Sequence, residues 1–288
     1  MSKCLLVYYS QGGTTSRIAE SIAKGLRAAE HVVDLHNLKD GPAPDPGAYD
    51  VLGLGTPVYY FRPPFIVTDH LNSLPDLLGK PFFVYVVYGV DCGDAGNIVR
   101  RALERKGGKE IGYSRYFGAD YFLGYLKRGY LFSPDHPKLD EIARAEVYGR
   151  EITARLGGRE YRKAEYDGPT HRVYRLERFL VNRLFVRQMY SRLFGVDHAK
   201  CNACGLCMKL CPTRNISGDK NGHPSWERNC ILCFSCEMKC PKDAISSPVT
   251  WSLFQPFMIY NIRRASRDRR VEMVRVVHAH GHTRIVGK

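Results

Sequence analysis

The 288-residue sequence lacks the signals of an exported or membrane-spanning protein. No stretch stays apolar for the length that a membrane span requires. The opening run MSKCLLVYYSQGG has no small-residue cleavage site, and Ser10 and Gln11 interrupt it, so the pattern indicates a strand and no secretory signal. We therefore expect a cytoplasmic protein without a transmembrane segment.

Two nucleotide-binding motifs are absent as well. Neither the G-x-x-x-x-G-K-[ST] loop of P-loop proteins nor the G-x-G-x-x-G dinucleotide fingerprint follows the first apolar run. No other segment resembles a pyridine-nucleotide site. These absences disfavour the direct use of NAD(P)H, whereas quinone-like substrates stay open.

Acidic residues are scarce in the second half of the chain. Residues 159–288 hold 24 Lys and Arg against 11 Asp and Glu, whereas residues 1–158 hold 19 against 18. Nearly all of the net charge of +14 therefore lies in the second half. Such a basic surface attracts an acidic protein partner, an anionic membrane or nucleic acid. The alternative is that it balances negative groups bound within the same half.

Strand and helix patterns alternate over the first half. In the first helix pattern Ile18, Ile22 and Leu26 recur four residues apart and form one apolar stripe. Alternation of this kind predicts an α/β fold with a doubly wound parallel sheet. We expect strands at residues 5–9, 31–35, 49–55, 82–88 and 111–117, and helices at 15–29, 98–106 and 137–156.

The loop after the first strand is rich in glycine and hydroxyl groups. It opens a helix, where free backbone N–H groups and the helix dipole favour an anion. The sequence therefore predicts a phosphate-binding loop, and the alternative is an ordinary helix N-cap. The loop consists of Ser10, Gln11, Gly12, Gly13, Thr14 and Thr15.

The Ser-x-x-Gly-x-Thr pattern of this loop resembles the phosphate loop of flavodoxins, which hold FMN. Residues 55–64 and 88–93 follow the next expected strands, where flavodoxins clasp the flavin ring. Tyr59 and Tyr60 are candidates to stack on that ring, or to plug an empty crevice. Gly12 departs from the family, because flavodoxins often have Thr there. The resemblance implies flavin contacts from Pro57, Val58, Tyr59, Tyr60, Phe61, Tyr88, Gly89, Asp91 and Gly93.

Eight of the ten cysteines fall within forty residues, in two copies of C-x2-C-x2-C-x3-C-P. This run resembles that of bacterial two-cluster ferredoxins, in which the fourth cysteine of each run binds the other cluster. Zinc is the rival for any C-x2-C, but structural zinc sites use four ligands in paired spacings, which two tandem runs with a third C-x2 step and a terminal Cys-Pro fit badly. The resemblance implies one [4Fe-4S] cluster on Cys201, Cys204, Cys207 and Cys240, and another on Cys230, Cys233, Cys236 and Cys211.

The segments outside these motifs are less informative. Residues 125–137 are expected as an extended loop near the flavin, and residues 171–194 as one arginine-decorated helix whose apolar face packs on a domain or on a second copy. Residues 251–262 precede an arginine cluster. They are interpreted as packing back on the first domain, with a membrane-surface anchor as the alternative.

The whole chain resembles the flavodoxin–ferredoxin fusion family. The resemblance implies a flavodoxin-like FMN-binding domain at 1–156, a basic helical connector at 157–196, a small α+β two-cluster ferredoxin domain at 197–248 and a basic tail at 249–288. The linker proper is expected at residues 157–171.

The expected function is electron transfer between FMN, the two clusters and a redox partner with an acidic docking face. The alternative is an oxidoreductase that acts on a quinone or NAD(P)H and uses the clusters as an internal wire. A nucleic-acid-binding role is a third and weaker hypothesis, because no recognised motif accompanies the arginines. A peripheral membrane contact and a homodimer stay open.

Overall fold

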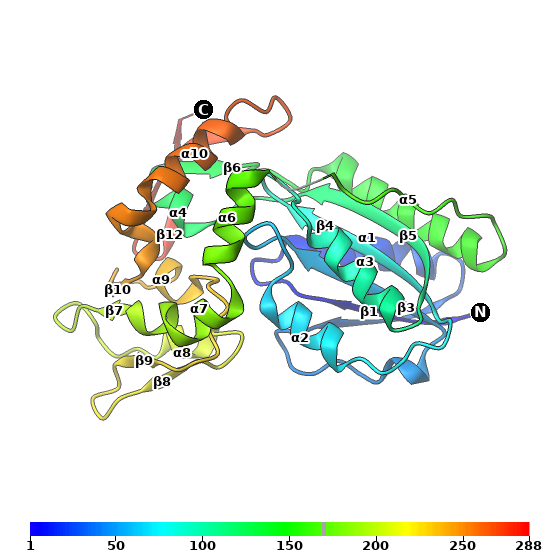
Figure 1. Ribbon diagram of the computed structural model, residues 1–288, viewed down its shortest axis with the longest axis horizontal. Coiled ribbons are helices and arrows are strands. Elements are labelled where there is room, and N and C mark those ends of the chain that lie inside the picture. The colour runs from blue at the N-terminus through cyan, green and yellow to red at the C-terminus, as the bar shows by residue number, and fades with distance from the viewer. Residues whose placement is uncertain (169–170, 288) are drawn as a thin grey trace. The chain divides into compact units, whose positions relative to one another are not determined.

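The structure is a computed structural model that describes residues 1–168 and 171–287 (Figure 1). The chain forms two compact units. The first unit consists of Met1–Ala119 and Asp135–Arg175, and the second of Asp120–Pro134 and Leu176–Lys288. The chain therefore passes between the units three times, and this division interrupts the expected domain at 1–156.

The first unit contains a five-stranded sheet in which all strands are parallel. The strand order β2-β1-β3-β4-β5 is that of a flavodoxin-like doubly wound sheet, so the expected fold class is confirmed. Strands β1 and β4 are almost wholly buried because helices cover both faces of the sheet. The strands are β1 (Lys3–Tyr8), β2 (Val32–Asn37), β3 (Val51–Pro57), β4 (Pro81–Tyr88) and β5 (Lys109–Phe117).

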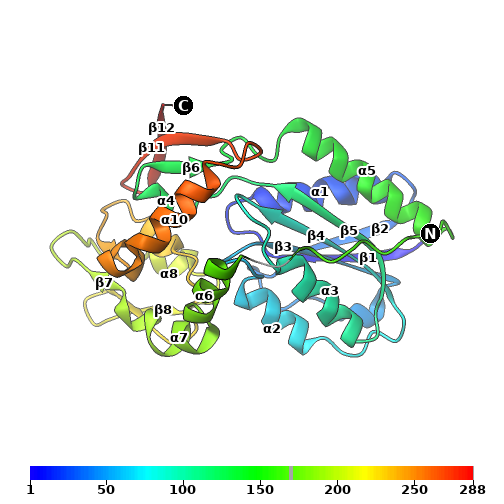
Figure 2. The same ribbon diagram turned by 45° about the horizontal axis from the view of Figure 1, so that its top comes forward.

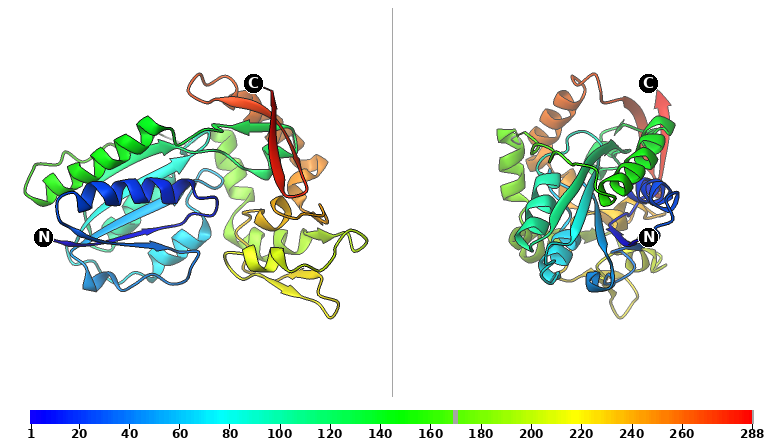
Figure 3. Two further views of the ribbon diagram at one scale, coloured as in Figure 1. Left: turned by 180° about the vertical axis from the view of Figure 1, so that it is seen from behind. Right: turned by 90° about the vertical axis from the view of Figure 1, so that its right-hand side faces the viewer.

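Helices lie on both faces of this sheet (Figure 3). Helices α1 (Thr14–Arg27) and α5 (Leu139–Leu156) share one face, and α2 (Phe65–Ser73) and α3 (Ala95–Arg105) share the other. Glycine permits the close approach of α1 and α5, because a Cβ atom on Gly25 would lie 2.1 Å from the carbonyl oxygen of Glu146. The sequence did not predict α2, which follows directly after a Pro-Pro pair.

The cysteine-bearing part of the second unit is built from short elements. Each cysteine run leads into a single short helix, α8 (Leu206–Leu210) or α9 (Ser235–Met238). Two antiparallel strand pairs accompany them. These pairs are β7 (Gly195–Val196) with β10 (Ile245–Ser246), and β8 (Ile216–Gly218) with β9 (Pro224–Trp226).

The rest of the second unit joins the middle of the chain to its end. Strand β6 (Tyr130–Phe132) pairs with β11 (Met273–Ala279), and β12 (His282–Gly287) completes the sheet (Figure 2). Helix α10 (Gln255–Ala265) packs on α4 (Leu123–Leu126). Leu126, Leu131, Val274 and Val276 form the shared core. The prediction of an extended loop at 125–137 was therefore wrong, because β6 forms within it. The prediction that residues 251–262 pack on the first domain was also wrong, because α10 packs on α4 within the second unit. The expected tail is a helix and a hairpin.

The expected helix at 171–194 is divided. It consists of α6 (Arg172–Leu180), α7 (Arg183–Gln188) and the 3-10 helix η2 (Tyr190–Leu193). The break falls at Asn182, whose side-chain oxygen accepts the Phe185 N–H at 3.1 Å and so caps α7. Among the described residues no helix is both long and apolar enough to cross a membrane.

The expected linker is tied to the first unit over most of its length. The Arg100 side chain is fully buried, pairs with Glu110 at 2.8 Å and donates to the carbonyl oxygen of Glu165 at 3.0 Å. Asp167 accepts from Arg115 at 2.8 Å. A buried guanidinium requires such hydrogen-bond partners. The contacts of Arg100 therefore hold this segment against the first unit. Residues 169 and 170 lie outside the described residues.

Candidate functional site

The predicted phosphate loop lies at the carboxyl end of β1, where it opens α1. Gly13 caps the helix with φ 89°, a left-handed conformation that glycine adopts without strain. A Cβ atom on Gly12 or Gly13 would meet no other atom within 4 Å, so space is open above the loop. In the described part of the chain, the N–H groups of Thr14 and Thr15 have no acceptor. These donors and this space fit a phosphate group.

Hydrogen bonds from neighbouring strands hold the loop in place. Asn37, at the end of β2, accepts the Ser10 N–H at 3.1 Å and donates to the Ser10 carbonyl oxygen at 3.0 Å. The Gln11 side-chain oxygen accepts from the hydroxyls of Tyr9 and Tyr59, both at 3.1 Å. Gln11 therefore joins the first loop to the second. Sequence reasoning missed Asn37, although its place at a strand end was a usable signal.

The second loop turns tightly at two residues with positive φ. Tyr59 and Arg62 exchange backbone hydrogen bonds of 2.9 and 3.2 Å. Between them, Tyr60 has φ 51° and Phe61 has φ 61°, which costs on the order of 1–3 kcal/mol for each non-glycine residue. Phe61 stacks on Tyr174 with ring centroids 3.7 Å apart. One face of the predicted flavin contact Phe61 is therefore occupied by a protein ring, while Tyr59 and Tyr60 stay half-buried.

The third loop packs directly on the second. The Asp94 N–H donates to the Phe61 carbonyl oxygen at 2.9 Å. A Cβ atom on Gly93, which has φ 53°, would lie 2.4 Å from that same oxygen, so only glycine fits. The Asp91 carboxylate accepts the Gly93 N–H at 2.8 Å and shapes the turn. At the loop's start, Tyr88 packs on Phe117 at 4.6 Å, and Gly89 is half-buried.

All three predicted loops thus lie where the parallel strands end, at the edge where doubly wound sheets bind ligands. Pro57 ends β3, and the adjoining Val58 N–H donates to the Val87 carbonyl oxygen of β4 at 3.1 Å. The first loop offers hydrogen-bond donors, and the other two offer aromatic and apolar surface. This combination suits a ligand with a phosphate at one end and a large flat ring at the other.

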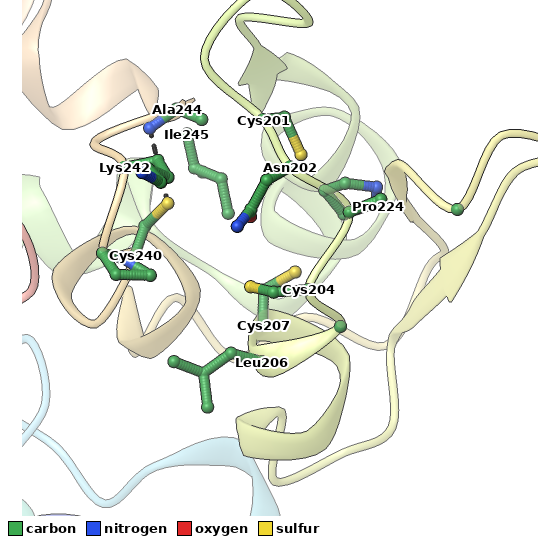
Figure 4. A pocket seen from close by; sticks show the side chains of 14 residues that line it. Cys201, Asn202, Cys204, Leu206, Cys207, Pro224, Cys240, Lys242, Ala244 and Ile245 are labelled. Atoms are coloured by element: carbon green, nitrogen blue, oxygen red, sulfur yellow. Dashed lines mark hydrogen bonds between the residues drawn. The ribbon is translucent and has the colours of Figure 1, made fainter.

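In the second unit, four cysteines from both runs line one pocket (Figure 4). They are Cys201, Cys204, Cys207 and Cys240. The pocket has an empty volume of about 370 Å³ that includes open solvent, and its other walls include Leu206, Pro224 and Ile245. The Cys240 sulfur accepts the Ala244 N–H at 3.4 Å. The structure thus brings the last cysteine of the second run to the first three of the first run.

The remaining four cysteines also lie near one another. Burial raises the pKa of the Cys230 thiol to about 12, and the neighbouring Cys233 and Cys211 raise it too. Burial beside Cys233 and Cys230 holds the pKa of Cys236 well above its usual value. The Cys211 sulfur accepts the Asn215 N–H at 3.2 Å. Cys211 therefore accompanies the second run, as Cys240 accompanies the first.

The donor set fits a cluster of several metal atoms. The first four thiols line one pocket, as the ligands of an iron–sulfur cluster do. Backbone N–H groups that donate to Cys211, Cys230 and Cys240 supply the hydrogen bonds that tune such clusters.

The two cysteine sites differ in their shielding. Cys204 is exposed in the first site, whereas Cys236 is buried in the second. Ile231, Leu232 and Phe234 beside the second site are all less than 10 % exposed, with values of 3, 7 and 4 %. Further aromatic rings surround them, because Phe234 packs near Phe122 at 5.8 Å and near Phe194 at 6.1 Å. Sequence reasoning missed these last two rings, which lie far from the cysteine motifs in the chain.

Comparisons with known proteins match both parts of the chain. Residues 5–123 match the family described as "Flavodoxin domain", and residues 194–217 match "4Fe-4S binding domain". A "Flavodoxin" of Synechococcus elongatus is 30% identical over 130 residues, which cover 42% of this chain and 75% of that protein. A "Ferredoxin" of Pyrobaculum islandicum is 39% identical over 59 residues, which cover 20% of this chain and 53% of that protein.

A third relative is larger. The "NAD(P)H dehydrogenase (quinone)" of Cupriavidus metallidurans is 27% identical over 199 residues, which cover 59% of this chain and 93% of that protein. The family matches thus place the similarity to flavodoxins in the first part of the chain and the similarity to 4Fe-4S binding domains in the second.

Proposed function

The chain belongs to the flavodoxin–ferredoxin fusion family, and from this premise we propose that it carries electrons between FMN in the first unit and two [4Fe-4S] clusters in the second. FMN supplies the exchange of one or two electrons, and each cluster supplies the exchange of one. A two-electron donor would thereby be connected to a one-electron acceptor, or the reverse. The clusters require a reducing compartment, so the cytoplasm is the proposed location.

The residues of the first unit would hold FMN by its two ends. The N–H groups of Thr14 and Thr15, with the hydroxyls of the same loop, would bind the phosphate. Tyr59 and Tyr60 would contact the ring, and Tyr88 and Gly89 would border it from the third loop. Phe61 would support the site indirectly. Its ring stacks on Tyr174, and this contact would hold the turn that carries Tyr60.

The observation that carries the proposal is the exchange of cysteines between the two runs. Cys240 lies with Cys201, Cys204 and Cys207 around one pocket, and Cys211 lies with Cys230. A single-cluster or zinc protein has no need of this exchange, whereas a two-cluster ferredoxin is built on it. The family match covers only the first run, so the second cluster is part of the proposal.

One experiment tests the cofactors and the carrier role together. Protein purified under strict anaerobiosis should contain about eight iron atoms and bind about one FMN. It should be reduced by a low-potential ferredoxin but show no turnover with NADH or NADPH. Zinc in place of iron would overturn the cluster proposal, and failure to take up FMN would overturn the flavin proposal.

The similarity to a protein named "NAD(P)H dehydrogenase (quinone)" favours one second candidate. The chain would then reduce a quinone-like molecule at its FMN, with the clusters as an internal wire. Sustained quinone reduction with NAD(P)H as the electron source would establish this function. Quinone reduction that requires reduced ferredoxin instead would make the quinone the acceptor of the proposed carrier.

A further inference from the structure

Two helical segments of the second unit pack together and leave their outer sides uncovered. The segment from Leu176 through α7 and η2 contacts the segment formed by η4 (Ser252–Phe254) and α10. The Asn261 amide donates to the buried Glu177 carboxylate at 3.0 Å. Farther along, the rings of Tyr190 and Phe254 meet edge to face with centroids 6.1 Å apart. These two contacts bring the segments together.

The outer side of this surface is unusually apolar. The first segment already buries apolar side chains within the unit, because Val181 and Val186 are both buried. The exposed side nevertheless carries Leu253 at 72% exposure, Leu184 at 66% and Phe179 at 65%. Exposed apolar side chains on neighbouring segments of a soluble protein indicate an interaction site. The exposed members, here called the apolar–arginine face, are Leu176, Phe179, Leu184, Phe185, Met189, Trp251, Leu253 and Ile259.

The charges beside these side chains are of one sign. Residues 178–193 and 244–267 contain no Asp or Glu at all. The acidic residue just before the first stretch, Glu177, is buried and bonded to Asn261. Arginines border the apolar side chains on both segments, and they are Arg178, Arg183, Arg187 and Arg192 on the first, and Arg263, Arg264 and Arg267 on the second.

We propose that the apolar–arginine face docks on the surface of an anionic membrane. Large aliphatic and aromatic side chains next to arginines are the signature of segments that lie in the headgroup region. The apolar side chains would enter the boundary between headgroups and acyl chains, while the guanidinium groups would bind lipid phosphates. A lipid surface matches the charge of this face, because a layer of anionic headgroups neutralises many arginines at once and needs no individually paired acidic side chains.

The proposal has a direct binding test with the anaerobic, cofactor-loaded protein. The protein should sediment with vesicles of phosphatidylcholine that contain about one third phosphatidylglycerol, but not with pure phosphatidylcholine. Replacing Arg263 and Arg264 by Gln should weaken binding about 30-fold, because each arginine contributes about fivefold. Raising the salt concentration should weaken binding of the unaltered protein as well.

Matched variants separate the face from general effects. Leu184→Glu and Leu253→Glu should each weaken vesicle binding about tenfold or more, through lost apolar contact and charge repulsion. Leu139→Glu on α5 should not, although this leucine of the first unit is even more exposed, at 86%. In the same way, Arg159→Gln with Arg162→Gln changes the same charge in the first unit and should leave binding nearly intact.

The result that overturns the proposal is the absence of binding to anionic vesicles at low salt by correctly folded protein. Equal loss of binding in the first-unit controls would also overturn it, because charge alone would then suffice. A concentration-dependent dimer that Leu184→Glu dissociates would assign the face to a second copy. Iron and FMN contents are measured for every variant, so these outcomes do not depend on the proposed electron transfer.

Discussion

The two units offer different kinds of contact to a redox group. The first unit offers backbone N–H groups, an open glycine loop and aromatic rings, all of which bind without covalent bonds. The second offers eight cysteines, a residue type that bonds to metal directly, and they form a clear pattern in the sequence. The comparison teaches that the cysteine sites are fixed by residue identity, whereas the loop site is fixed by backbone geometry. Mutations should therefore act on the two units by different mechanisms.

The largest expected effect comes from the exchanged cysteine. Cys240→Ser should remove the cluster of the first site and lower the iron content by about four atoms, although the residue belongs to the second run. Iron analysis and the spectrum of the reduced protein measure the loss. Cys92→Ser in the first unit is the matched control and should retain all iron. Unchanged iron in Cys240→Ser would refute the assignment of this cysteine to a cluster.

The next largest effect separates the loop site from the cysteine sites. Gly13→Val should abolish FMN retention, because a side chain there fills the open space and strains the backbone by roughly 1–2 kcal/mol. Gly79→Val is a close control, since Gly79 has φ 82° and equally open surroundings. Fluorescence titration with FMN measures the difference. Equal loss of FMN in both variants would attribute the effect to stability and not to the loop.

Within the second unit, the two cysteine sites should differ in the rate of iron release. A chelator should remove iron in two phases, the faster from the first site, where Cys204 is exposed. The slower phase belongs to the site shielded by Ile231, Leu232 and Phe234. Cys240→Ser should lack the fast phase. If the remaining iron of that variant is released rapidly, the shielding does not distinguish the sites.

The smallest expected effect concerns the strained turn. Tyr60→Gly should relieve a positive φ and raise the free energy of unfolding by about 1 kcal/mol, while weakening FMN binding through the lost ring. Leu78→Gly, at φ 48° on the surface, should raise stability similarly without affecting FMN. Denaturant unfolding and FMN titration give the two readings. Unchanged FMN affinity in Tyr60→Gly would exclude this ring from the site.

Much of the fold was predictable because its signals are local. Buried strands such as β4 are continuous apolar runs, and the phosphate loop carries its glycines in sequence. The cysteine pattern needs no structure to be read. The break at Asn182 also had a local signal, an N-cap residue within an apolar helix pattern.

The errors concern contacts between distant parts of the chain. Strand β6 pairs with β11 near the end of the chain. The sequence of residues 125–137 alone does not indicate this pairing. The stacking of Phe61 on Tyr174 was not predicted, because Tyr174 lies far along the chain. An arginine in a helix pattern such as Arg100 is usually expected on the surface. In the structure it is buried, because Glu110 and the backbone of Glu165 supply its partners. Tertiary partners of this kind cannot be derived from periodicity or spacing.

The central claim is that the flavin and the clusters exchange electrons in one protein. The most direct measurement mixes the oxidised, cofactor-loaded protein with reduced low-potential ferredoxin under argon and follows flavin and cluster absorbance together. The account predicts reduction of both, with slower flavin reduction in Cys240→Ser and no bleaching by NADH or NADPH. Rapid flavin bleaching by NAD(P)H, with flavin kinetics unaltered in Cys240→Ser, would contradict it.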